Sequence, residues 1–350
     1  MAQAPRIDSL DPSAALPGAE VRVLGSDLSA NARLPAVRVA GMAAAVVISS
    51  ANLLVARVPE AAVTGLVEVE VSGRPPVPSP AALEVGAQIA ENLHPVCSPA
   101  LDAEGNIFVT LSGTRGQKTP VSLFRLDANF TLKPFSSALT NPSGLAFDRE
   151  GTLFASSRFD GSVYRVAANG AATLVAQGLG VATGIAFDPA GDLHVGDRSG
   201  TIFKIDRLGK TFVFATLEPS VAAYHLAFGP DRHLYVAGPS ASSRDSIWCI
   251  NPHGAVTPFF EGLGRPQGLA FDIAGNLYVA ASYRGRRGII RIDPNRQAAC
   301  VVSGMNLVGL AFAPGSPGGP SSSALILATH TSLYHLPWAV AGALLPPRAD

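Results

Sequence analysis

The stretch PQGLAFDIAGNLYVA, residues 266–280, contains a glycine, an apolar run, Asp-x-x-Gly and a second apolar run. An Asp side chain hydrogen-bonds the backbone that follows it and Gly tolerates positive φ, so Asp-x-x-Gly is typical of a tight turn. Short apolar runs on both sides of a turn indicate strands that are buried on both faces. The stretch therefore predicts a β-hairpin.

Similar sequence motifs recur along the chain, so the hairpin is one unit of a repeat. They occupy residues 97–110, 143–156, 183–196, 224–237, 267–280 and, in degenerate form, 308–329. The positions equivalent to Asp272 are 40 to 46 residues apart, at Asp102, Asp148, Asp188, Gly229 and Ala313. Further apolar segments follow the hairpins and predict four strands per unit. A period just over 40 residues with four short strands is typical of a β-propeller blade.

The sixth repeat ends at SLYHLPWAV without an evident fourth strand. The segment at 87–92 precedes the first hairpin in the same way that the fourth strand of one unit precedes the hairpin of the next. We expect it to pair into the sixth blade, which closes the ring and removes two exposed edges. Residues 339–350 are expected to form a C-terminal tail.

The stretch PQGLAFDIAGNLYVAASYRGRRGIIRID resembles an NHL repeat, and residues 86–338 resemble the six-bladed NHL and gluconolactonase-type propellers. Residues 1–85 are a different unit. The segment PRIDSLDPSAALPGAEVRVLGSDL begins a series of short strands separated by Pro and Gly turns, which predicts an immunoglobulin-like sandwich. Its residue order resembles the IPT/TIG domain. The expected fold is therefore all-β, with an immunoglobulin-like sandwich followed by a six-bladed propeller.

Composition and charge limit the class of partner. Lys plus Arg and Asp plus Glu both total 26, so the net charge is zero and a nucleic-acid partner is not expected. The basic segment 282–293 is interpreted as a solvated loop. No stretch is long and apolar enough to predict a transmembrane span. The three cysteines lack metal-site spacing and are expected as buried free thiols.

The N-terminus has neither the basic start nor the apolar core of a signal peptide. As written, the sequence predicts a cytoplasmic protein, and an extracytoplasmic one if a leader has been removed. The IPT/TIG resemblance implies a spacer or adhesion module, the role of such domains in bacterial proteins.

Propeller ligands commonly bind where the inner strands open onto the central channel. The glycine that precedes the first apolar run of each hairpin is called the repeat glycine (Gly144, Gly184, Gly268 and Gly309). The residues before it, together with neighbouring positions at the same end of the sheet, are therefore the candidate ligand-binding residues. The candidates are Ser143, Thr183, Asp197, Tyr224, His225, Gln267 and His330. No residue is assigned a catalytic or metal-binding role.

The gluconolactonase-type resemblance implies a divalent-metal site with a glutamate in the first blade and an asparagine in a later one. Cys97 and Gln267 stand at those positions here. A hard cation such as calcium prefers carboxylate oxygens, which this ring does not offer. No cofactor is therefore expected, and calcium or zinc belongs to the alternative below.

Two functions remain open. The sequence favours a non-catalytic binding protein, whose channel face captures a small molecule, a glycan or a peptide. The alternative is a metal-dependent lactonase or related hydrolase of the gluconolactonase type with a diverged site. Fold alone does not decide between them, because propellers serve both roles.

Overall fold

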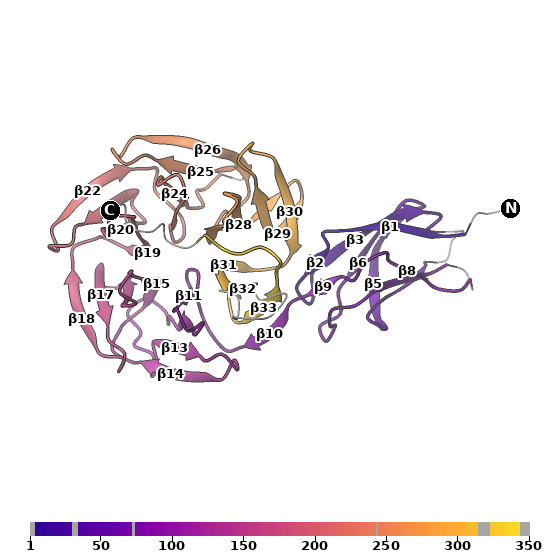
Figure 1. Cartoon of the computed structure of the whole chain (residues 1–350), viewed down its shortest axis with the longest axis horizontal. Helices are drawn as coiled ribbons and strands as arrows, with labels where there is room; N and C mark the ends of the chain where they lie inside the picture. The colour runs from indigo at the N-terminus through magenta and orange to yellow at the C-terminus, as the bar shows by residue number, and fades with distance from the viewer. Residues whose placement is uncertain (1–3, 30–33, 72–73, 243, 314–322, 344–350) are drawn as a thin grey trace.

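The computed structural model of the chain describes residues 4–29, 34–71, 74–242, 244–313 and 323–343. This part of the chain is all-β and contains no helix. Figure 1 shows a ring of sheets with a smaller sandwich beside it. Among the described residues there is accordingly no helix that could span a membrane.

The N-terminal part is an immunoglobulin-like sandwich, called the IPT/TIG domain below after the family that its sequence resembles. Its strands are β1 (Arg6–Asp11), β3 (Glu20–Ser26), β4 (Ala36–Val39), β5 (Met42–Ser49), β6 (Leu53–Arg57), β7 (Val67–Glu70) and β8 (Val77–Pro78). They hydrogen-bond in the order β1-β3-β6-β5-β4-β7-β8. Strand β5 connects the two halves of the sandwich, because its first part pairs with β4 and its second part pairs with β6.

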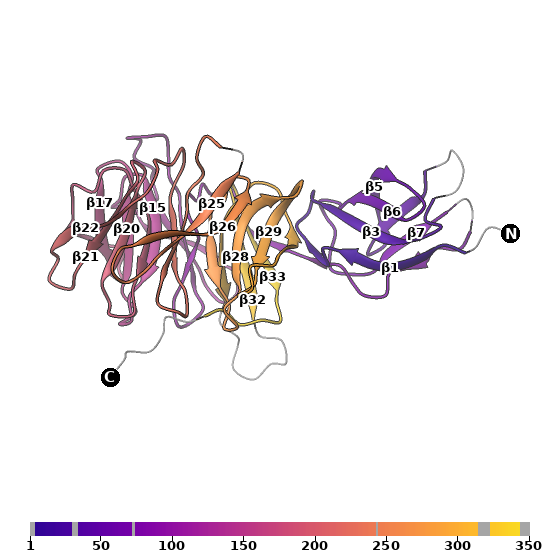
Figure 2. The same cartoon turned by 90° about the horizontal axis from the view of Figure 1, so that it is seen from above.

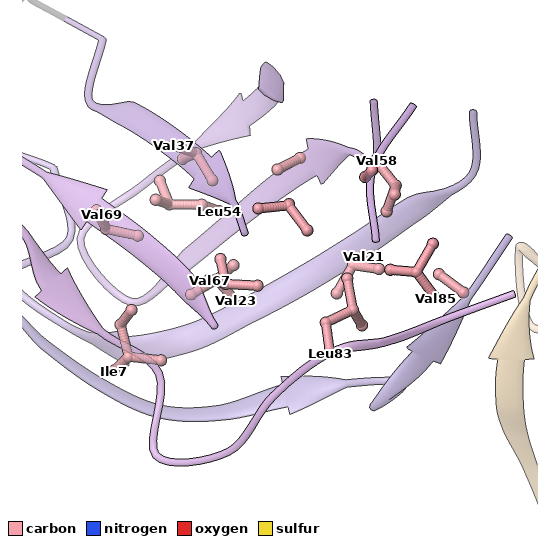
Figure 3. Packing of buried hydrophobic residues seen from close by; sticks show 14 of the residues in the cluster. Ile7, Val21, Val23, Val37, Leu54, Val58, Val67, Val69, Leu83 and Val85 are labelled. Carbon is pink, nitrogen blue, oxygen red and sulfur yellow. The ribbon is translucent and has the colours of Figure 1, made fainter. Parts of the chain in front are cut away.

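The core of this domain lies between the two halves, as Figure 3 shows. Side chains alternate along β3, so that Val21 and Val23 point inward and the residues between them outward. Leu54 and Val69 face them from β6 and β7, and both are fully buried. The short β-branched side chains suit a pleated surface that is buried on one side.

The second part is a propeller-like arrangement of sheets. Each of five sheets has four strands. Four of these follow one another in chain order, and the strands of each are as follows. The first sheet contains β11 (Ala100–Leu101), β12 (Ile107–Thr110), β13 (Leu123–Leu126) and β14 (Leu132–Ser136), and the second contains β15 (Pro142–Phe147), β16 (Leu153–Ser157), β17 (Ser162–Val166) and β18 (Ala172–Ala176). The third contains β19 (Ala182–Phe187), β20 (Leu193–Asp197), β21 (Thr201–Ile205) and β22 (Thr211–Thr216), and the fourth contains β23 (His225–Phe228), β24 (Leu234–Ala237), β25 (Asp245–Ile250) and β26 (Val256–Leu263).

The fifth of these sheets joins the two ends of the ring. It contains β31 (Leu307–Ala313), β32 (Ala324–Thr329), β33 (Leu333–Pro337) and β10 (Ala87–Ala90). Strand β10 pairs antiparallel with β33, so that Gln88 lies opposite Tyr334. The segment before the first hairpin thus supplies the outermost strand of the last sheet, and the two lie side by side in Figure 1.

The remaining sheet has six strands and connects the two domains. It contains β27 (Leu269–Phe271), β28 (Leu277–Tyr283), β29 (Arg286–Ile292) and β30 (Ala298–Ser303), extended by β2 (Ala14–Ala15) and β9 (Glu84–Val85). Strand β2 pairs in parallel with both β30 and β9. The backbone of the IPT/TIG domain therefore covers the outer edge of a propeller sheet, an edge that would otherwise be open to pairing.

The predicted turn is present in the hairpin of β27 and β28. The carboxylate of Asp272 accepts hydrogen bonds from the backbone N–H groups of Ala274 (2.9 Å) and Asn276 (2.8 Å). Gly275 has a φ of 81°, the left-handed conformation for which glycine is suited. The same residue types perform the same function in the other Asp-x-x-Gly copies, for example where Asp148 accepts from Thr152 N–H (2.7 Å).

The end of the described chain packs against the propeller. Ala343 donates its N–H to the carbonyl of Phe271 (2.8 Å), and Gly342 forms a β-bridge with Asp272. A Cβ on Gly342 would lie 2.3 Å from the Cβ of Phe312, so this segment lies directly on the propeller. Residues 344–350 of the expected tail lie outside the described residues.

The basic segment 282–293 is not a solvated loop, and that interpretation was wrong. Strand β28 continues to Tyr283 and β29 begins at Arg286, so two residues connect them. The guanidinium of Arg286 donates to both carboxylate oxygens of Asp11 in the IPT/TIG domain, at 2.8 Å from Nη1 to Oδ1. Beside this pair, Leu16 donates its N–H to the carbonyl of Ser303 (2.8 Å). These contacts hold the two domains together.

We expect Arg286→Ala to loosen the docking of the IPT/TIG domain by about 1 kcal/mol, because a partly exposed bidentate pair contributes about that much. The measurement is hydrogen exchange at the Leu16 amide, which crosses the domain boundary. Exchange should accelerate in Arg286→Ala and stay unchanged in Arg284→Ala, whose guanidinium lies over Tyr283 and has no ion pair among the described residues. Equal exchange in both variants would show that the strand pairing alone holds the domains.

Candidate ligand-binding face of the propeller

The inner strands of neighbouring sheets approach each other most closely at the repeat glycines. A Cβ on Gly184 would lie 2.3 Å from the carbonyl oxygen of Tyr224, and one on Gly268 would lie 2.4 Å from the Cα of Gly309. Backbone hydrogen bonds join the strands at this level, from Gly184 N–H to Tyr224 (2.9 Å) and from Gly268 N–H to Val308 (3.1 Å). The glycines thus form a constriction of the channel, and the candidate residues lie beside it.

Three candidates, Ser143, Thr183 and Tyr224, are buried where the inner strands pack together. The hydroxyl of Thr183 donates to the carbonyl of Gly196 (2.9 Å) and accepts from the N–H of Tyr224 (3.0 Å). Burial raises the pKa of Tyr224 to about 12, and its hydroxyl donates to the carbonyl of Glu218. Ser143 is buried as well, and its hydroxyl has no hydrogen-bond partner. Thr183 therefore links its own sheet to the next inner strand, and all three side chains are closed to solvent.

Asp197 also has partners within the protein. Its carboxylate accepts from the N–H of Val181 (2.7 Å) and from the hydroxyl of Ser199. A Cβ on Gly180 would lie 2.5 Å from the Asp197 carboxylate, which shows how closely the loop before β19 encloses it. The carboxylate therefore fixes this loop.

His225 occupies the repeat-glycine position of its sheet and is 4% exposed. Its Nε2 has no hydrogen-bond partner, and burial lowers its pKa to about 3. The imidazole is therefore neutral at physiological pH. His194, on β20, is equally enclosed and packs edge-on against Phe214 and Phe228, with ring centroids 4.7 and 5.1 Å away.

Gln267 and His330 lie together at a cavity of about 300 Å³ on this side of the propeller. Its lining also includes Arg265 and Arg287, from the loop before β27 and from β29. Burial lowers the pKa of His330, and the positive charges of His94 and Arg265 lower it further. Of the seven candidates, these two are the ones that share a cavity.

The arginines were not among the candidates. Arg158 and Arg198 directly follow β16 and β20, and His330 directly follows β32, so all three hold the same position in different sheets. Arg158 donates to the carbonyl of Gly113 (2.9 Å) and Arg198 to that of Val221 (2.8 Å). Burial lowers the pKa of Arg158, and the nearby charges of Arg198 and Arg115 lower it as well. A repeat position with two arginines and a histidine is the signal that could have identified them.

The residues at the expected metal position do not fit a divalent cation. Burial raises the pKa of Cys97 to about 12, so the residue is a thiol and not the thiolate that binds metals. Gln267 offers one neutral oxygen. Among the described residues there is no group of three His, Cys, Asp or Glu side chains that could hold a metal ion.

The opposite end of the channel is apolar. Five phenylalanines at or next to the ends of the inner strands line a second cavity of about 290 Å³ together with Ala343: Phe147, Phe187, Phe228, Phe271 and Phe312. The two ends therefore differ in chemistry. One offers packed aromatic rings, and the other offers arginine, histidine and amide groups.

Comparisons with known proteins agree with this architecture. Residues 5–84 match the IPT/TIG domain, which confirms the sequence-based assignment of the first domain. No curated protein matches the chain in sequence. Among solved structures, the chain is similar to a putative gluconolactonase, with 18% identity, a TM-score of 0.59 and coverage of 74% of this chain and 93% of that one.

Two further structures are similar in fold. A gluconolactonase from Xanthomonas campestris has 16% identity and a TM-score of 0.55, with 71% of this chain and 88% of that one covered. An auxiliary nutrient binding protein from Bacteroides thetaiotaomicron has 11% identity and a TM-score of 0.54, with 96% and 98% covered. At these identities the likeness shows the fold alone.

Proposed function

We propose that the protein is a non-catalytic binding protein, which captures a small molecule, glycan or peptide at the propeller face that carries Gln267 and His330. The observation that carries this proposal is the cavity of about 300 Å³ where these side chains meet two arginines. Ligand sites are concave and combine a few convergent polar groups with less polar walls. We take the propeller to be six-bladed and NHL-type, counting the sheet that β2 and β9 extend as one blade.

The IPT/TIG domain acts in this proposal as a rigid spacer. It adds two strands to a propeller sheet and forms the Asp11–Arg286 pair, so it positions the binding face instead of contributing to it. The similarity to the auxiliary nutrient binding protein extends over 96% of this chain, so the two structures share this two-domain fold.

The alternative is a metal-dependent lactonase, supported by the similarity in fold to gluconolactonases. Metal content separates the two functions, because such a hydrolase would need a metal to activate water or polarise the lactone. We expect the purified full chain to contain no stoichiometric calcium or zinc after loading and dialysis, measured by inductively coupled plasma mass spectrometry.

Three variants sharpen this test. A stoichiometric metal that is lost in the Gln267→Ala/His225→Ala double variant, together with lactone hydrolysis by the unaltered chain, would establish the enzyme and overturn the binding proposal. Glycan and peptide arrays test the proposal directly. Binding that Gln267→Ala weakens and Gln297→Ala, a change in an outer turn, leaves unchanged would support it.

A further inference from the structure

We propose that the ligand of this face is a small organic anion bearing a carboxylate or a phosphate, held in the cavity beside Gln267 and His330 by Arg265 and Arg287. This inference rests on the proposed binding function and adds the charge and the chemical class of the ligand.

The first argument is the composition of the cavity wall. The polar side chains that line the cavity are Arg265, Gln267, Ser282, Arg287, Asn306 and His330. No carboxylate of the described residues lines it. Two guanidinium groups and an imidazole therefore meet at one hollow without a negative charge from the protein, an arrangement complementary to an anion.

The second argument is that these arginines have no counter-charge elsewhere. Neither Arg265 nor Arg287 forms an ion pair in the described part of the chain, whereas the adjacent Arg286 is fully engaged by Asp11. Arg265 and His94 both lie near enough to His330 for their charges to disfavour its protonation. Like charges held together repel, so an anion placed among them is favoured by each.

The third argument is the surrounding field. Because strands in each sheet alternate in direction, the connections after the second and fourth strands all lie at the face where the inner strands begin. Further basic residues on these connections include Arg115, Lys118, Arg158, Arg198 and Arg244. Fewer carboxylates lie on them: Glu91, Asp160 and Asp197 are already hydrogen-bonded within the protein, and Glu218 is exposed. The face therefore attracts anions toward the cavity.

The chemistry of the wall specifies the ligand further. The planar fork of an arginine binds a carboxylate or a phosphate through two parallel hydrogen bonds. The amides of Gln267 and Asn306 and the hydroxyl of Ser282 suit hydroxyl groups, because they both donate and accept. A volume of about 300 Å³ is at the small end of ligand pockets. A hydroxylated anion of monosaccharide size fits these constraints.

Isothermal titration of the full chain with glucuronate, glucose 6-phosphate and neutral glucose tests the inference. We expect at least one anion to bind and glucose to bind at least tenfold more weakly, because one charge-assisted hydrogen bond contributes about 1.5 kcal/mol or more. The two anions distinguish a carboxylate from a phosphate ligand. Arg265→Gln and Arg287→Gln should each weaken the anion about tenfold by the same reasoning.

Arg291→Gln is the matched control, since Arg291 lies on β29 with Arg287, is exposed and does not line the cavity. Unchanged affinity in this variant and reduced affinity in the other two would support the inference. If glucose binds with the same affinity as the anions and Arg265→Gln does not change that affinity, the ligand is not an anion and the binding function stands. If no probe binds at millimolar concentration, the inference is overturned, and the glycan and peptide arrays decide the proposed function separately.

Discussion

A single methyl group at Gly144 is expected to destabilise the protein by about 3 kcal/mol or more, the upper range for overpacking a rigid core. In Gly144→Ala the new Cβ would lie 2.4 Å from the carbonyl oxygen of Thr183 and 2.9 Å from the N of Ile185. Both atoms belong to the backbone of the neighbouring inner strand β19, so no side chain can rotate away. The strands must separate, and the packing between the two sheets is lost. Urea unfolding of the full chain, followed by circular dichroism, measures the effect.

Gly151→Ala is the control for this substitution. Gly151 lies in the turn of the same hairpin, and a Cβ there would meet no atom within 4 Å. Its φ of 78° makes alanine strained by about 1 kcal/mol, without any clash. The free energy of unfolding should therefore fall much less than in Gly144→Ala. Equal losses would show that the repeat glycines are needed for their conformation and not for the close approach of the inner strands.

Most of what could be predicted about the propeller came from the repeated hairpin motif. Its turn chemistry is local, so the hairpins over 143–156, 183–196 and 267–280 are confirmed. The inner strands also crowd together at the repeat glycines, where a Cβ would meet the backbone of the neighbouring strand. Each of these features is determined by residues within one short window of the sequence.

Contacts between distant segments were harder to predict. Nothing in the two-residue strand β2 indicates that it pairs with β30, almost 290 residues later. The pair between Asp11 and Arg286 was missed for the same reason, and the basic segment was interpreted as solvated. Each partner has an ordinary sequence context, and the contact depends on how the two domains dock.

The arginines of this face were not predicted from the sequence. Asp197 is the last residue of β20, whereas Arg158 and Arg198 stand one residue after the ends of β16 and β20. Successive side chains in a strand point to opposite faces, so a shift of one residue selects different chemistry. Thr183 and Tyr224 lie at the inner strands, and their hydrogen bonds to each other and to the backbone close them to solvent.

Acid should destabilise the protein through His225. Burial holds the pKa of this histidine at about 3 in the folded chain, below the value of about 6.5 in an unfolded chain. As pH falls below about 6.5, the unfolded chain therefore binds a proton that the folded chain does not bind, and stability is lost until pH reaches about 3. At pH 5 the loss relative to neutral pH is about 2 kcal/mol from this one group.

The variant His225→Leu removes the titration and keeps an apolar side chain in an apolar position, where Nε2 has no hydrogen-bond partner to lose. The difference in free energy of unfolding between pH 7.5 and pH 5, measured in urea, should shrink by about 2 kcal/mol in this variant. His253→Leu is the control, because His253 is exposed in an outer turn and its replacement should leave the difference unchanged. An unchanged difference in His225→Leu would mean that water or a rearranged neighbour accommodates the charged imidazole. Burial of His194, whose pKa is lowered for the same reason, accounts for part of the acid sensitivity that remains.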